Sequence, residues 1–231
     1  MFASLLHIPD GFINVPTSLV FMALAAIGVG LTLKGATREL DDKTAPLAGL
    51  TTVFIFAAQM VNFPVAAGTS GHLLGGALAA ILIGPYAATL AITIVLLLQA
   101  LLFADGGLIA SGLNVFNLSL IGVWGGYIVF VTVRKVLPKK KSSLPIAGFI
   151  AAFVQVPLAA TGFVIQYAIG AESTIPVSTV FAAMFSTHLL IGIGEGLITA
   201  LTISAVMASR SDLIFGWRAI APKLEIKGAK Q

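Results

Sequence analysis

The chain has 231 residues, of which 58% are hydrophobic and 10% charged, and its mean hydropathy is +1.04. This leaves too little polar surface to cover a soluble globule, so the composition indicates an integral membrane protein. The formal net charge at pH 7 is +4, and there is no cysteine. Disulfides and thiolate metal ligands are therefore excluded, and any metal site must use nitrogen and oxygen.

Apolar segments bounded by Gly, Pro or charge follow one another along the whole chain and predict an all-α, polytopic membrane protein with about seven transmembrane helices. They cover residues 17–34, 46–67, 71–83, 85–103, 113–133, 144–169 and 178–208. The third is short and Gly84-Pro85 joins it tightly to the fourth, so six spans plus a re-entrant segment is the alternative. The first lacks a basic start and a small-residue cleavage site, so we expect a retained span.

We expect one membrane domain over 1–231 without a separate soluble catalytic domain, because the predicted spans occupy most of the chain. Within it we distinguish an N-terminal strand, a helical bundle and a cytoplasmic tail, over 6–16, 17–208 and 209–231.

Lysine and arginine gather in the loops after the first, fifth and seventh helices, and with seven spans all 13 fall on one side. Because such residues stay cytoplasmic, we expect the N-terminus outside and the C-terminus inside the cell. Topology and contact with anionic lipids of the bilayer explain these loops, so we infer no nucleic-acid partner. The opposite side carries only the acidic charges Asp10, Asp105 and Glu172, which favours a cation.

Two of the three histidines, His7 and His72, fall at this outer face although they are far apart in the sequence. His188 begins about ten residues into the last helix, which places it roughly 15 Å deep. Imidazole nitrogen binds Zn, Cu, Ni and Co well, whereas Mg and Ca prefer oxygen. A hydrogen-bonded loop residue would explain one such histidine, but the two together predict a transition-metal site.

Four stretches occur in a fixed order: HIPDGFI, GTSGHLLGG, LLLQALLFADGGL and HLLIGIGEGLIT. Together they resemble the CbiM/NikM family, the substrate-binding membrane (S) components of energy-coupling-factor (ECF) cobalt and nickel transporters. GTSGHLLGG is more similar to the cobalt branch, CbiM. The resemblance implies ATP-driven import of cobalt(II), with nickel(II) next, across the cell membrane of a bacterium or archaeon, and a link to cobalamin biosynthesis.

The resemblance also implies the ligands. In this family the mature chain typically begins Met-His-Ile-Pro, and the metal is held by the terminal amine, the nitrogen and imidazole of the second residue, and a histidine of the Gly-rich segment. His7 and His72 take these places here, with the amine on Leu6.

The sequence departs from the family at Leu6, because MFASL precedes it and converts the amine into a poorer amide donor. Either the site uses fewer backbone donors, or translation starts at Leu6, or the leader is trimmed. We expect the functional chain to start at position 6, which intact-mass analysis of protein from its native gene would test.

Other polar residues are candidates for supporting roles. Asp10 provides the turn into the first helix, and Gln59, Asn62, Thr69 and Ser70 could accept an imidazole N–H. His188 and Glu195 share one face of the last helix. Glu195 is too deep for an outer site, so a structural or coupling role toward partner subunits fits it better.

The sequence contains no G-x-x-x-x-G-K-[ST] phosphate loop, so ATP hydrolysis is expected on other chains. The resemblance implies a transmembrane coupling subunit, cytoplasmic ATPase subunits and a small accessory membrane protein as partners. It implies no permanently bound cofactor, only transported Co²⁺ or Ni²⁺, and a transport component rather than an enzyme.

Two other functions stay open. An ion-coupled metal carrier or channel without ATPase could use Glu195 and the DGG stretch as its path. A rhomboid-like intramembrane serine protease could use Ser70 and His188 as a dyad, but this leaves His7, Asp10 and His72 without a role.

Overall fold

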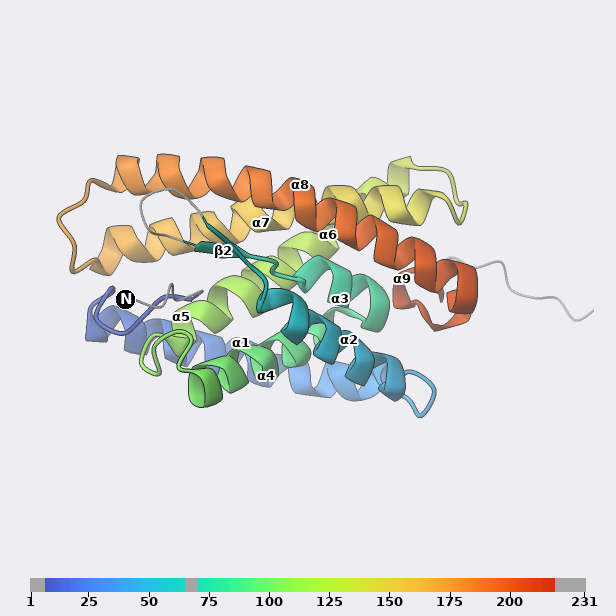
Figure 1. The fold of residues 1–231 in the computed structure, drawn as a ribbon. Coiled ribbons are helices and arrows are strands. Elements are labelled where there is room, and N and C mark those ends of the chain that lie inside the picture. The colour runs from blue at the N-terminus through green and yellow to red at the C-terminus, as the bar shows by residue number, and fades with distance from the viewer. Residues whose placement is uncertain (1–6, 65–69, 219–231) are drawn as a thin grey trace, which may run out of the picture.

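The computed structural model describes residues 7–64 and 70–218, which form a bundle of lengthwise helices (Figure 1). Among these residues, five helical segments are long and apolar enough to cross a membrane. They are α1 (Val15–Glu39), α4 (Pro85–Phe103), a continuous helix of α5 (Ser111–Val115), the π-helix η2 (Phe116–Gly122) and α6 (Val123–Val136), then α7 (Ser143–Gly170) and α8 (Val177–Arg210). The chain is thus an all-α, multi-pass membrane protein, as predicted.

The second and third predicted segments also contain helices, but these are short: α2 (Ala45–Gln59) and α3 (Gly76–Ile83). Residues predicted to extend them form instead a small antiparallel pair, β1 (Asn62–Pro64) and β2 (Ser70–His72), with Asn62 opposite His72. The prediction of helix through 67 and from 71 is therefore wrong where the structure describes these residues. Pro64 has no N–H for a helix, and the glycines around His72 favour other conformations.

Helix α3 forms the centre of the bundle, and all eight of its residues are buried. It ends at Gly84, whose φ of +95° requires glycine, and α4 begins at once with Pro85. A side chain on Gly84 would collide with the carboxylate of Glu39, which accepts a hydrogen bond from Ala87 N at 2.8 Å. The tight Gly-Pro junction expected from the sequence is confirmed.

The segment before α1 lies along the connection between α4 and α5 and reaches the end of α7. Asp10 Oδ1 accepts a hydrogen bond from Ala110 N at 2.9 Å. Asn14 N donates to Gly170 O at 2.7 Å, and Glu172 N donates to Phe12 O at 3.2 Å. Asn14 also caps α1 by accepting from Thr17 N. These contacts fix the course of the chain that carries His7.

The bundle has two different ends (Figure 1). The N-terminal segment and the α4–α5 and α7–α8 connections lie at one end, with the acidic Asp10, Asp105 and Glu172. The α1–α2 and α6–α7 connections lie at the other, together with η3 (Ser211–Leu213) and α9 (Phe215–Arg218). The described lysines and arginines belong to that second end. That it faces the cytoplasm stays a prediction from the charge rule.

Candidate metal site

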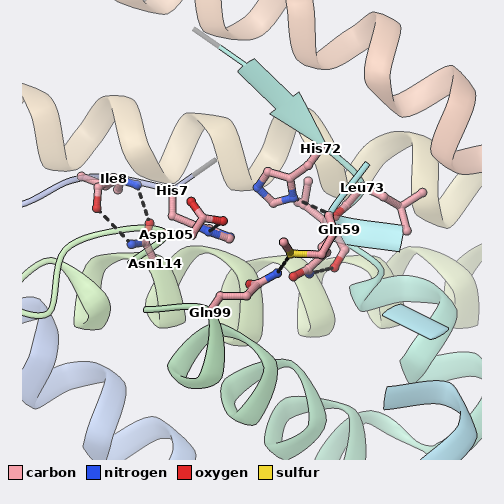
Figure 2. Close-up of polar contacts among 10 residues, drawn as sticks. His7, Ile8, Gln59, His72, Leu73, Gln99, Asp105 and Asn114 are labelled. Carbon is pink, nitrogen blue, oxygen red and sulfur yellow. Dashed lines mark hydrogen bonds and ion pairs between the residues drawn. The ribbon is translucent and has the colours of Figure 1, made fainter. Parts of the chain in front are cut away.

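The structure brings His7 and His72 together at the acidic end of the bundle (Figure 2). Their ring centroids are 4.6 Å apart, and the ring planes are inclined by 58°. Each residue is only 7% exposed. Two imidazoles from distant parts of the chain therefore share one buried place.

His72 ends β2, and its ring is held in a defined tautomer. Nδ1 lies 2.9 Å from Leu73 O. A carbonyl oxygen can only accept, so Nδ1 of the neutral ring carries the proton and Nε2 has the free lone pair. Burial, reinforced by the neighbouring His7, lowers the pKa of His72 to about 3. The ring is therefore neutral near pH 7, the form that binds metal ions.

His7 faces a carboxylate. Its Nδ1 lies 3.2 Å from Oδ2 of Asp105, which is only 8% exposed. Asp105 follows the end of α4 and donates its backbone N–H to Gln99 O at 3.1 Å. The next residue, Gly106, has a φ of +88°, and a Cβ on it would lie 2.8 Å from the Cβ of His7. The Asp-Gly pair thus supplies a charge and leaves space for the histidine.

The backbone just after His7 is held by an asparagine. Ile8 N donates to Asn114 Oδ1 at 3.1 Å, and Asn114 Nδ2 donates to Ile8 O at 3.3 Å (Figure 2). Gly107 N also donates to Ile8 O, at 3.0 Å. Asn114 lies in the last turn of α5, two residues before the start of the π-helix η2, a type of helix often found at functional sites. This two-sided contact fixes the peptide groups on both sides of Ile8.

The other predicted residues whose side chains the structure describes contact backbone groups. Asp10 binds the backbone before α5, and Gln59 Nε2 donates to Leu74 O at 2.8 Å. His188 is directed to its own helix, with Nδ1 2.7 Å from Met184 O. The side chains of Asn62 and Ser70 are not described, and Leu6 and Thr69 lie outside the described residues.

Glu195 does not meet the histidine rings, yet its carboxylate contacts the chain close to His72. It accepts hydrogen bonds from Leu74 N and Gly75 N at 2.8 and 2.9 Å. The depth estimate from the sequence did not foresee this contact, because it took no account of how residues 73–75 descend into the bundle.

Within the described part of the chain, no three His, Cys, Asp or Glu side chains are arranged to hold a metal ion together. A metal bound by the histidine pair would thus need further donors from the backbone, a terminal amine or water. Sequence reasoning missed Asp105 and Asn114 as site residues. Asp105 could have been found, because it is acidic, is predicted to lie outside and belongs to the motif LLLQALLFADGGL. Nothing in the local sequence distinguishes Asn114.

The fold and the site define a multi-pass membrane protein with a buried histidine pair at one end. Residues 7–213 match the CbiM family, described as the cobalt uptake substrate-specific transmembrane region. The chain belongs to this family of transport proteins.

Individual relatives agree with this assignment. A predicted metal transport protein of Haloquadratum walsbyi is 38% identical over 91% of this chain and 94% of its own length. The fused nickel transport protein NikMN of Rhodobacter capsulatus is 33% identical over 94% of this chain and 66% of its own length. A crystal structure of a truncated transition metal transporter has a TM-score of 0.79 and 28% identity, covering 87% of this chain and 98% of that one. A transport family leaves the serine protease interpretation without support.

Proposed function

We propose that this chain is the substrate-binding membrane subunit of an ATP-driven, ECF-type importer, and that His7 and His72 bind the imported metal ion. The observation that carries the proposal is the buried contact between these two rings, which come from distant parts of the sequence. Buried polar atoms normally have a bonding partner, and a cation bound between the two imidazoles would supply one to the free Nε2 of His72.

The ring separation fits one ion shared by both histidines at neighbouring corners of its coordination sphere. An imidazole nitrogen binds such an ion at about 2 Å, and the ring centre lies about 1.2 Å beyond it. Two rings at a right angle about the ion then have centres about 4.5 Å apart, and two rings on opposite sides about 6.4 Å. The observed 4.6 Å corresponds to neighbouring corners.

Neighbouring corners are also what the family's ligand set requires. An amine on residue 6, the amide nitrogen of His7 and its Nδ1 would occupy three corners of a square, with the amide in the middle. Nε2 of His72 would take the fourth corner, next to Nδ1 of His7. The ion would replace the contact of Nδ1 with Asp105 and leave that carboxylate beside it. Four nitrogens in a plane suit nickel and related ions.

We propose cobalt(II) as the first substrate and nickel(II) as the second. The family description names cobalt, and the motif GTSGHLLGG is more similar to the cobalt branch, whereas the relative from Rhodobacter capsulatus is named for nickel. The partners would be a transmembrane coupling subunit, cytoplasmic ATPase subunits and a small accessory membrane protein. An ion-coupled carrier is the competing proposal.

Calorimetric titration of the purified protein with Co²⁺ and Ni²⁺ tests the site. We expect His72→Ala to abolish high-affinity binding while the protein stays folded, because one residue of a short strand contributes little to the helical core. Ser70→Ala, in the same strand, should weaken binding only slightly. Unchanged affinity in His72→Ala would refute the site.

A further inference from the structure

The carboxylate of Glu195 lies inside the bundle, on α8, and is only 1% exposed. Its two oxygens accept three hydrogen bonds. Leu74 N donates to Oε2 at 2.8 Å and Gly75 N donates to Oε1 at 2.9 Å, while Gln155 Nε2 donates to Oε1. Burying a carboxylate costs free energy unless hydrogen bonds satisfy its oxygens, and hydrogen bonds to a charged acceptor are stronger than those between neutral groups. The loop from β2 to α3 is therefore firmly joined to α8.

The same loop is held from two further helices. Gln155 of α7 accepts from Ala77 N at 2.6 Å through Oε1, and Gln59 of α2 donates to Leu74 O at 2.8 Å. Gly75 has a φ of +78°, and a Cβ there would lie 2.9 Å from the side chain of Ile55. The chain after His72 thus has a fixed course, set by side chains from α2, α7 and α8.

We propose that Glu195 is a positioning residue for His72. By fixing Leu74 and Gly75, it holds the end of β2 and keeps the Leu73 carbonyl where it fixes the tautomer of His72. Nε2 of His72 then stays directed toward His7 without rearrangement. The inference rests on the proposed metal site and adds that its affinity depends on a carboxylate that does not touch the ion.

The replacement Glu195→Gln keeps the shape of the side chain but leaves one acceptor oxygen for three donors. Its amide N–H₂ must also face an N–H group. We expect the affinity for Co²⁺ to fall by about 10- to 100-fold, the effect typical of losing a residue that orients a metal ligand. Glu195→Asp keeps the charge with a shorter reach and should give a smaller loss, which keeps the test usable if Glu195→Gln does not fold.

A double-mutant cycle separates positioning of His72 from general loosening of the bundle. In the His72→Ala background, Glu195→Gln (or Glu195→Asp) should cause no further loss of affinity, because the ligand that it positions is gone. Cu²⁺ is the suitable probe for these weakened sites, since nitrogen ligands bind it most tightly among the divalent ions of this series. Thr199→Val is the matched control, because Thr199 is fully buried one turn further along α8 and its hydroxyl has no hydrogen-bond partner among the described residues. It should leave affinity unchanged in both backgrounds.

The outcomes also distinguish this inference from the proposed function. If His72→Ala leaves affinity intact, the metal site itself is wrong. If His72→Ala abolishes binding but both Glu195 variants bind normally, only the positioning role fails. An equal further loss in the His72→Ala background would also overturn it, since Glu195 would then act on the whole bundle.

Discussion

At the scale of single residues, metal binding at the candidate site would depend on the partner of each ring nitrogen. Nδ1 of His72 donates a hydrogen bond to the Leu73 carbonyl, so Nε2 is the ring nitrogen left with a lone pair for a metal ion. Nδ1 of His7 instead faces the carboxylate of Asp105. A negative charge beside a bound divalent cation stabilises the bound state strongly at a buried position, because little water is present to screen the attraction.

Asp105→Asn should therefore weaken Co²⁺ binding by about tenfold or more, because the amide keeps the shape but removes the charge. Glu172→Gln is the matched control: Glu172 is an exposed acidic residue at the same end of the bundle. It should change affinity little at physiological salt, since solvent and salt screen exposed charges. Titration of both variants in parallel measures this. An equal loss in both would show that general attraction to an acidic surface is what matters.

At the scale of elements, the candidate site is formed by the N-terminal segment, a short hairpin and the connection after α4. Side chains of α2, α7 and α8 hold the loop after the hairpin, Asn114 holds the N-terminal segment, and Asp10 of that segment holds the connection after α4. Two asparagines three residues apart, Asn114 in α5 and Asn117 in the π-helix η2, make different contacts. Asn114 holds the backbone of Ile8, whereas Asn117 forms a two-way amide contact with Gln166 inside the bundle, at 2.8 and 3.0 Å.

The two asparagines allow a crossed comparison. Asn114→Ala should lower Co²⁺ affinity at least several-fold, because the segment carrying His7 loses its two-sided contact. Asn117→Ala should leave affinity unchanged but reduce the free energy of unfolding by about 1–3 kcal/mol, the cost of leaving a buried polar partner unsatisfied. Titration and thermal unfolding of both variants check this. If Asn114→Ala changed only stability, the contact would be a structural one.

At the scale of the whole molecule, the bundle has the candidate metal site at one end and its basic loops at the other, with the buried helix α3 in the bundle between them. The sequence has no phosphate loop of the common type. Binding and energy supply are therefore expected to reside on different chains.

Membrane vesicles containing this chain alone should bind Co²⁺ but not concentrate it, because binding without an energy source cannot drive accumulation. Adding the coupling and ATPase subunits, with the ATPase subunits and ATP inside the vesicles, should produce accumulation of radioactive Co²⁺ in the vesicle interior. Vesicles with the same partners and the His72→Ala chain serve as the control. Accumulation driven by a proton or sodium gradient in the absence of partners would favour the ion-coupled carrier.

The sequence by itself determined the membrane class, the seven helical segments, the Gly84-Pro85 junction and the placing of His7 and His72 at one end. These follow from local hydropathy, from proline and glycine chemistry and from loop charge, all of which act over short stretches of chain. Composition alone also excluded thiolate ligands, because the chain has no cysteine.

Only the tertiary structure decided how the site is built. Hydropathy extended the predicted helices through 67 and from 71, but backbone pairing between 62–64 and 70–72 and the position of Pro64 gave strands there instead. Asp105 meets His7, Asn114 holds Ile8, and Glu195 reaches Leu74 across long sequence separations. Such contacts depend on how separate helices pack and on where the π-helix shifts the register, and no local pattern of residue types encodes either.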